Sequence, residues 1–76
     1  MMNSDIVNSL AEMLRQAPKG EQSTFIHLFG IRFGNELAGY KLDELRTVCE
    51  EAGAKASWGT ELRKMVKLSK YVVEKT

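Results

Sequence analysis

The chain contains a single cysteine, Cys49, among its 76 residues. No intramolecular disulfide can form, so one hydrophobic core must hold the fold together. A chain of this length has room for one small domain, which we place over residues 1–76. The length also excludes most enzyme scaffolds that enclose a substrate. We therefore expect a binding module, a regulator, a subunit of a larger assembly or, at the limit, a very small enzyme.

Apolar residues recur at helical spacing along most of the chain, and this period predicts an all-α domain of about four helices. We expect the first helix over residues 4–17, where Pro18 stops it. The third helix is expected over residues 42–52, because Gly53 can adopt the left-handed conformation that ends a helix.

The segment between these helices, residues 23–38, is rich in aromatic and β-branched residues that also suit a strand. Strict alternation of apolar and polar residues fails, whereas an i, i+3, i+7 stripe fits a helix. We expect one central helix, continuous or kinked; the alternative is that Gly30 and Gly34 break it into shorter pieces. Gly30, Gly34 and Ala38 fall four residues apart on one line. This line suits a close crossing with another helix of the chain or, as a second use, a contact in a homodimer.

The last helix is expected over residues 58–74, after Ser57 as a capping residue. Helical spacing separates its residues into two halves. The apolar half consists of Trp58, Leu62, Met65, Val66, Leu68, Ser69, Val72 and Val73. The polar half consists of Arg63, Lys64, Lys67, Lys70, Tyr71 and Glu74. This separation predicts a helix that packs on one side and is charged on the other.

Charge is distributed unevenly, although the whole chain carries a formal net charge of only +1. Residues 1–38 carry a net charge of −1, whereas residues 52–76 contain six basic and two acidic residues, a net charge of +4. Clustered cations release counterions when they contact phosphates, and Tyr71 among them can reach a sugar or a base. On charge alone, the simpler interpretation is that these lysines solvate the outer face of a terminal helix, because surface helices routinely carry several lysines.

The last two predicted helices and the turn at Gly53 follow the order of a helix-turn-helix, in which the second helix lies in the major groove of DNA. The chain resembles the small bacterial and phage helix-turn-helix-like proteins in residues 42–45, 51–53 and 57–64. The resemblance implies that the second helix faces duplex DNA through Thr60, Arg63, Lys64 and Lys67, with Lys55 and Lys70 nearer the phosphates.

Two features depart from the common form of this motif. Three residues, Ala54, Lys55 and Ala56, separate the turn glycine from Ser57 and lengthen the turn. Gly59 stands where the second helix of the motif carries a branched apolar side chain. The departures leave open a pair of helices that has only the shape of a helix-turn-helix.

The sequence contains little that indicates a catalytic or metal-binding site. His27 is the single histidine, lies among apolar residues and has no second ligand at metal-binding spacing, so we expect a partly buried imidazole with a partner. Cys49 lies on the apolar stripe of the third helix, where a thiol behaves as a small hydrophobic group. We therefore expect no enzyme activity, no metal and no cofactor.

The sequence leads to two hypotheses of function. In the first, the chain is a transcriptional regulator or DNA-associated accessory protein that binds double-stranded DNA, by itself or as a homodimer, through Lys55, Thr60, Arg63, Lys64, Lys67, Lys70 and Tyr71. In the second, it is a protein-interaction module, such as a phage-encoded inhibitor or a subunit of a larger complex, whose basic face meets an acidic protein surface. No apolar run is long enough to span a membrane and the start lacks the pattern of a signal peptide, so we expect a cytoplasmic protein.

Overall fold

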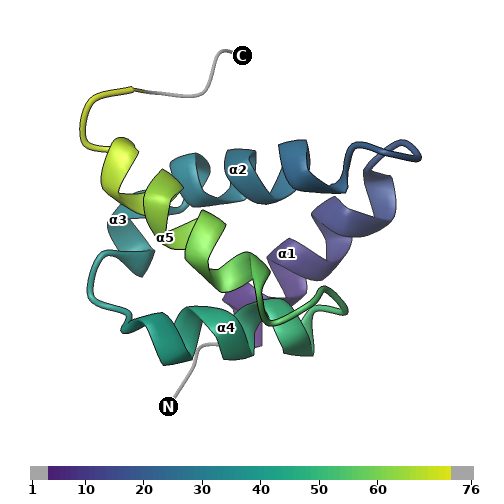
Figure 1. The fold of residues 1–76 in the computed structure, drawn as a ribbon, viewed down its shortest axis with the longest axis horizontal. Coiled ribbons are helices and arrows are strands. Elements are labelled where there is room, and N and C mark those ends of the chain that lie inside the picture. The colour runs from purple at the N-terminus through teal and green to yellow at the C-terminus, as the bar shows by residue number, and fades with distance from the viewer. Residues whose placement is uncertain (1–3, 73–76) are drawn as a thin grey trace.

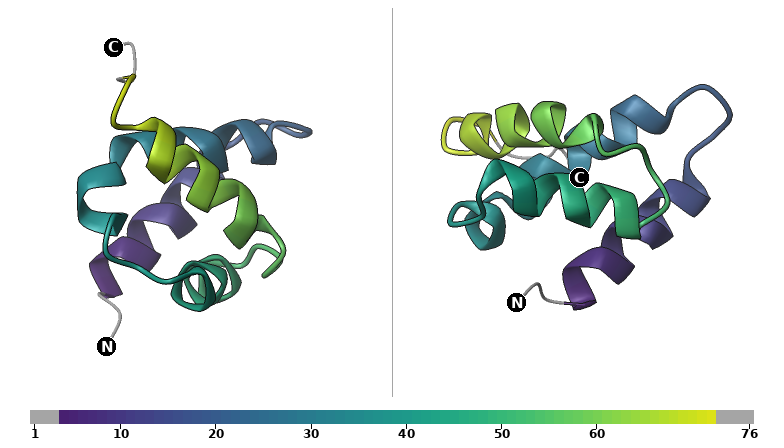
Figure 2. Two further views of the ribbon diagram at one scale, coloured as in Figure 1. Left: turned by 60° about the vertical axis from the view of Figure 1, so that its left-hand side comes forward. Right: turned by 60° about the horizontal axis from the view of Figure 1, so that its bottom comes forward.

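The computed structural model describes residues 4–72, which form helices and turns and no strand (Figure 1). The five helices are α1 (Ser4–Gln16), α2 (Gln22–Arg32), α3 (Gly34–Leu37), α4 (Leu42–Glu51) and α5 (Trp58–Leu68). The predicted all-α class is confirmed. Helix α5 packs against α2, α3 and α4, whereas α1 packs on α2 and α4 and makes no contact with α5 (Figures 1 and 2).

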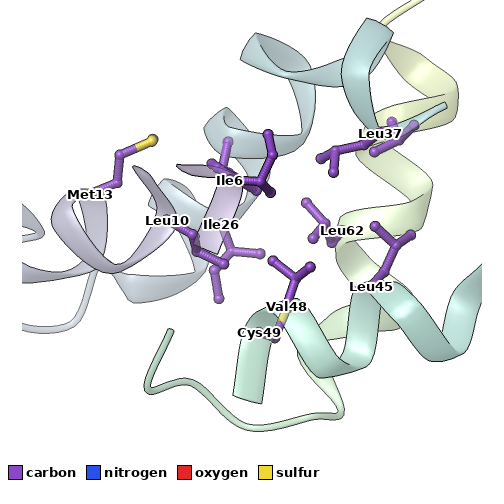
Figure 3. Close-up of a cluster of buried hydrophobic side chains, with 11 residues drawn as sticks. Ile6, Leu10, Met13, Ile26, Leu37, Leu45, Val48, Cys49 and Leu62 are labelled. Carbon is purple, nitrogen blue, oxygen red and sulfur yellow. The ribbon is translucent and has the colours of Figure 1, made fainter. Parts of the chain in front are cut away.

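An apolar core lies where the five helices meet (Figure 3). Each helix contributes at least one buried side chain to the set Ile6, Leu10, Met13, Ile26, Phe29, Leu37, Leu45, Val48, Cys49, Leu62 and Val66. Burying one large aliphatic or aromatic side chain stabilises a fold by about 1.5–3 kcal/mol. Within residues 4–72 no polar or charged side chain is buried, so every such side chain of this part of the chain is at least partly exposed.

The central segment is divided at Phe33, where the sequence predicts one helix over residues 23–38. Phe33 has φ −107° and ψ 20°, outside the helical region, and its ring packs on that of Phe29 with centroids 4.8 Å apart. The backbone bonds continue across the bend, because the Phe33 amide donates to the Phe29 carbonyl and the Leu37 amide to the Phe33 carbonyl, both at 2.9 Å. The expected helix is therefore kinked at Phe33 into α2 and the short α3, whereas Gly30, one of the two glycines expected to break it, lies inside α2.

Helix α5 ends at Leu68, so the predicted helix to residue 74 is wrong within the described residues, and Glu74 lies outside them. The Ser69 hydroxyl donates to the Val66 carbonyl at 2.6 Å, the acceptor that the Lys70 amide would need to continue the helix. The Lys70 amide donates instead to Lys67, at 3.4 Å, and the chain leaves the helix in a tight turn. At the end of α5 a serine hydroxyl thus occupies the Val66 carbonyl, while the next backbone amide forms the shorter-range bond of a turn.

The end of α4 follows the Schellman pattern, with Gly53 at φ +97° as predicted. The Ala54 amide donates to the Cys49 carbonyl at 2.9 Å, and the Gly53 amide donates to the Glu50 carbonyl at 3.1 Å. Ala54 also packs against the core beside the buried Cys49. The motif therefore satisfies the last carbonyls of α4 and fixes the direction in which the chain leaves it.

The longer turn before α5 contains backbone hydrogen bonds between residues three apart. Ser57 makes no capping bond through its side chain, so the predicted cap is wrong. The amides of Trp58, Gly59 and Thr60 donate instead to the carbonyls of Lys55, Ala56 and Ser57. The three residues that lengthen the turn therefore supply or position the acceptors that a capping side chain would have supplied.

Two glycines of the central segment lie directly under α5. A Cβ atom added at Gly30 would lie 2.5 Å from Met65 Cβ, and one added at Gly34 would overlap the side chain of Ser69. Gly30 and Gly34 are both buried, whereas Ala38 is exposed. The glycine line thus serves a crossing within the chain, the first of the two uses that the sequence indicates.

Gly59 likewise allows a close contact between helices, here between α5 and α4. It is buried, and an added Cβ atom would lie 2.8 Å from both the backbone nitrogen and the Cα atom of Arg46. The missing side chain thus lets the first turn of α5 touch the backbone of α4. The departure from the common motif has a structural reason, because a branched residue could not fit here.

We expect Gly59→Ala to lower the free energy of unfolding by about 1–3 kcal/mol, since an added methyl forces the α4 backbone away. The control is Gly39→Ala, because a Cβ atom at Gly39 meets nothing within 4 Å. That variant should stay within about 0.5 kcal/mol of the wild type. Urea unfolding followed by the fluorescence of Trp58, the single tryptophan, measures both. Equal stability of the two variants would contradict the close contact.

Candidate nucleic-acid interface

The outer side of α5 carries four residues spaced i, i+3, i+4 and i+7, which places them on one face of the helix. The opposite side of the same helix buries Leu62 and Val66 in the core. All four outer residues are exposed: Thr60, Arg63, Lys64 and Lys67. The packing of α5 on α2 and α4 thus turns the predicted DNA-facing side toward solvent.

The other three predicted site residues lie in the turns that flank α5. Lys55 precedes the helix, and Lys70 and Tyr71 follow it; all three are exposed, Tyr71 to 83%. We call the whole set the basic strip: Lys55, Thr60, Arg63, Lys64, Lys67, Lys70 and Tyr71. These residues lie along α5 and in the turns at its two ends.

The cations of the basic strip differ in how far they are neutralised. Lys64 Nζ donates to Glu61 Oε2 at 3.1 Å. Arg63 and Lys67 make no ion pair or side-chain hydrogen bond with any residue in the range 4–72. Because no acidic side chain within this range competes for them, these two cations are the best placed to bind an anionic ligand.

Glu61 is the acidic residue beside the basic strip, and both of its oxygens are engaged. Oε1 lies 3.3 Å from His27 Nε2 on α2, and Oε2 accepts the bond from Lys64. The hydrogen bond from Lys64, followed by that from His27, holds the pKa of the Glu61 carboxyl below its ordinary value. Glu61 therefore stays ionised well into the acid range.

The sequence did not reveal Glu61 as a bridge between two helices, because it lies 34 residues from His27. His27 itself is as expected, a half-buried imidazole with a partner, its side chain 37% exposed. To predict this pair, one would need to know that α2 and α5 pack together at Gly30 and Gly34. Helical spacing alone does not show this contact.

A shallow groove of about 510 Å³ lies between α1 and the end of α2. Its lining mixes charges of both signs, including Asp5, Glu12 and Arg32, and contains no residue of the basic strip. Within the described residues, no three His, Cys, Asp or Glu side chains gather in a group that could hold a metal ion. The groove therefore presents no concentrated charge comparable to that of the strip.

Cys49 lies in the core between α4 and its neighbours and is fully buried. Burial raises the pKa of the Cys49 thiol to about 11, since the thiolate would lose its hydration. A nucleophilic cysteine needs a lowered pKa and access to solvent. The thiol has neither, which agrees with its predicted role as a small hydrophobic group.

The fold and the site together define a protein of the helix-turn-helix type: α4 packs, a glycine turn follows, and α5 presents a charged outer side. The chain matches the family described as HTH-like domain over residues 2–75, and it belongs to this family. No curated protein and no solved structure matches it. None of the helices described here is both long and apolar enough to cross a membrane.

The raised thiol pKa predicts that stability falls in alkaline solution. Between the ordinary thiol pKa of about 8.5 and the folded value of about 11, the unfolded chain loses a proton that the folded chain retains. The stability of the wild type relative to Cys49→Ala should therefore be constant below this window and decline through it, by about 1–3 kcal/mol. Urea unfolding of both proteins at a series of pH values measures the difference. Parallel profiles for the two proteins would show that the thiol ionises normally.

Proposed function

We propose that the chain binds double-stranded DNA through the basic strip, without catalysis, as a small transcriptional regulator or DNA-associated accessory protein. The observation that carries this proposal is the pair Arg63 and Lys67, exposed one turn apart on α5 and unpaired within residues 4–72. Membership in the HTH-like family supports it, because α5 is the second helix of the pair.

The dimensions of α5 suit a major groove. An α-helix with its side chains is about 10–12 Å across, and the groove is about 12 Å wide. Thr60 lies in the first turn, where a recognition helix meets base edges. Arg63 can donate two bonds to a guanine, and Lys67 and Lys70 lie further along, where phosphate contact is expected.

The close packing of α5 adds to this proposal. The helix lies against Gly30 and Gly34 on one side and, through Gly59, against α4 on the other, so closely that a Cβ atom at any of these glycines would clash. A helix held in this way keeps its outer side in a fixed orientation. DNA would then meet a preformed surface, and binding would need little ordering of the protein.

A second candidate function rests on apolar side chains that are exposed at and after the C-terminal end of α5. Leu68, Tyr71 and Val72 are 40%, 83% and 38% exposed, and they are the large apolar side chains exposed within the described residues. Leucine and valine gain nothing from phosphates, whereas aromatic and apolar anchors beside cations suit a protein partner with an acidic surface. This observation favours a protein-interaction module as the alternative.

We expect the double variant Arg63→Ala/Lys67→Ala to lose most of its affinity for duplex DNA while remaining folded. Each phosphate contact adds about 0.9 to the slope of log affinity against log salt, so the slope should fall by about 1–2. Fluorescence anisotropy with a labelled duplex over a salt series gives both quantities, and circular dichroism checks the fold.

The matched control is Arg15→Ala/Lys19→Ala, which removes the same two residue types outside α5, at the end of α1 and in the turn after it. It should keep nearly the wild-type affinity and slope. Equal losses in both double variants would mean that net charge, and not the basic strip, drives binding. Absence of any duplex binding at low salt would reject the DNA proposal and leave the acidic protein partner.

A further inference from the structure

The basic strip is connected to α2 by a group of three ionisable side chains: His27, Glu61 and Lys64. The imidazole Nε2 of His27 lies 3.3 Å from Glu61 Oε1, and Lys64 Nζ lies 3.1 Å from Glu61 Oε2. The three side chains are between 36% and 63% exposed, so solvent and an approaching ligand both reach them. One carboxylate is thus shared between a member of the strip and the one histidine of the chain.

The charges that face His27 come from α5. Glu61 contacts it directly, and Lys64 follows through the shared carboxylate. Within residues 4–72, no charged side chain of α1, α3 or α4 forms an ion pair or hydrogen bond with His27. With a neutral imidazole the group carries no net charge, and with a protonated imidazole it carries +1.

We propose that protonation of His27 regulates the proposed DNA binding, tightening it at lower pH, where the imidazole facing Glu61 takes up a proton. At higher pH, Glu61 offsets the charge of Lys64 and leaves it less able to meet a phosphate. A protonated His27 balances Glu61 from α2, which releases Lys64 to the strip. The inference rests on the proposed function, because it concerns the same surface.

Linkage fixes the sign of the effect. If the imidazolium favours binding, bound DNA must in turn favour uptake of a proton by His27. The gain in affinity is then complete at low pH, where the ring is charged, and is lost as the pH rises and the ring loses its proton.

The experiment measures duplex affinity by anisotropy between pH 5.5 and 7.5 at constant ionic strength, the range in which a histidine changes charge. The wild type should bind about 3- to 10-fold more tightly at the lower pH. His27→Gln keeps a hydrogen-bonding group opposite Glu61 but cannot take up a proton. It should bind with the wild-type affinity at pH 7.5 and show no gain at pH 5.5.

A second pair of variants tests the carboxylate. Glu61→Gln should tighten binding at pH 7.5, because Lys64 is no longer offset. The control is Glu12→Gln on α1, which also removes a carboxylate paired with a cation three residues away, Arg15, but on a helix without contact to α5. It should change the affinity much less. Equal effects of the two variants would reduce the role of Glu61 to net charge and overturn the proposed release of Lys64.

The proton itself can be observed, since His27 is the single histidine and its ring protons give isolated NMR signals. At a fixed pH, the addition of duplex DNA should move these signals toward those of the protonated ring. Signals that show no added protonation, together with pH-independent binding, would overturn this inference and leave the proposed function standing. Absence of duplex binding at every pH would overturn both.

Discussion

The position of α5 depends on the absence of three side chains. Gly30 and Gly34 lie under one side of the helix, and Gly59 brings its first turn onto the backbone of α4. These contacts are closer than any residue with a Cβ atom would allow, so they set the separation of the helices before side-chain packing fills the remaining space. Leu62 and Val66 then complete the core from the inner side of α5. The exposure of its outer side follows from this arrangement.

Much of this arrangement could be predicted from the sequence. Helices α1 and α4 lie close to their expected bounds, because Pro18 and Gly53 give strong local stop signals. The exposure of Arg63 and Lys67 follows from helical spacing alone, because the apolar residues of α5 can face only one way. Local signals were sufficient wherever one residue type or one period decides the outcome.

The remaining features depend on contacts that no local pattern records. The bend at Phe33 accompanies a ring contact with Phe29, and the end of α5 accompanies a bond from the Ser69 hydroxyl to a backbone carbonyl. The pairing of His27 with Glu61 needs the crossing of α2 and α5 to be known first. Sequence periodicity shows which side of a helix is apolar, but not which residues of two helices meet.

Under the proposed function, the early end of α5 limits how much of a duplex one copy can read. The helix ends at Leu68, where the Ser69 hydroxyl bonds to the Val66 carbonyl. The described helix is about 16 Å long, and base pairs are stacked about 3.4 Å apart, so α5 spans about five base pairs. Under the proposed function, a footprint of this size recurs by chance throughout any genome. One copy would therefore act at many places unless a second copy or a bound partner doubled the recognised length.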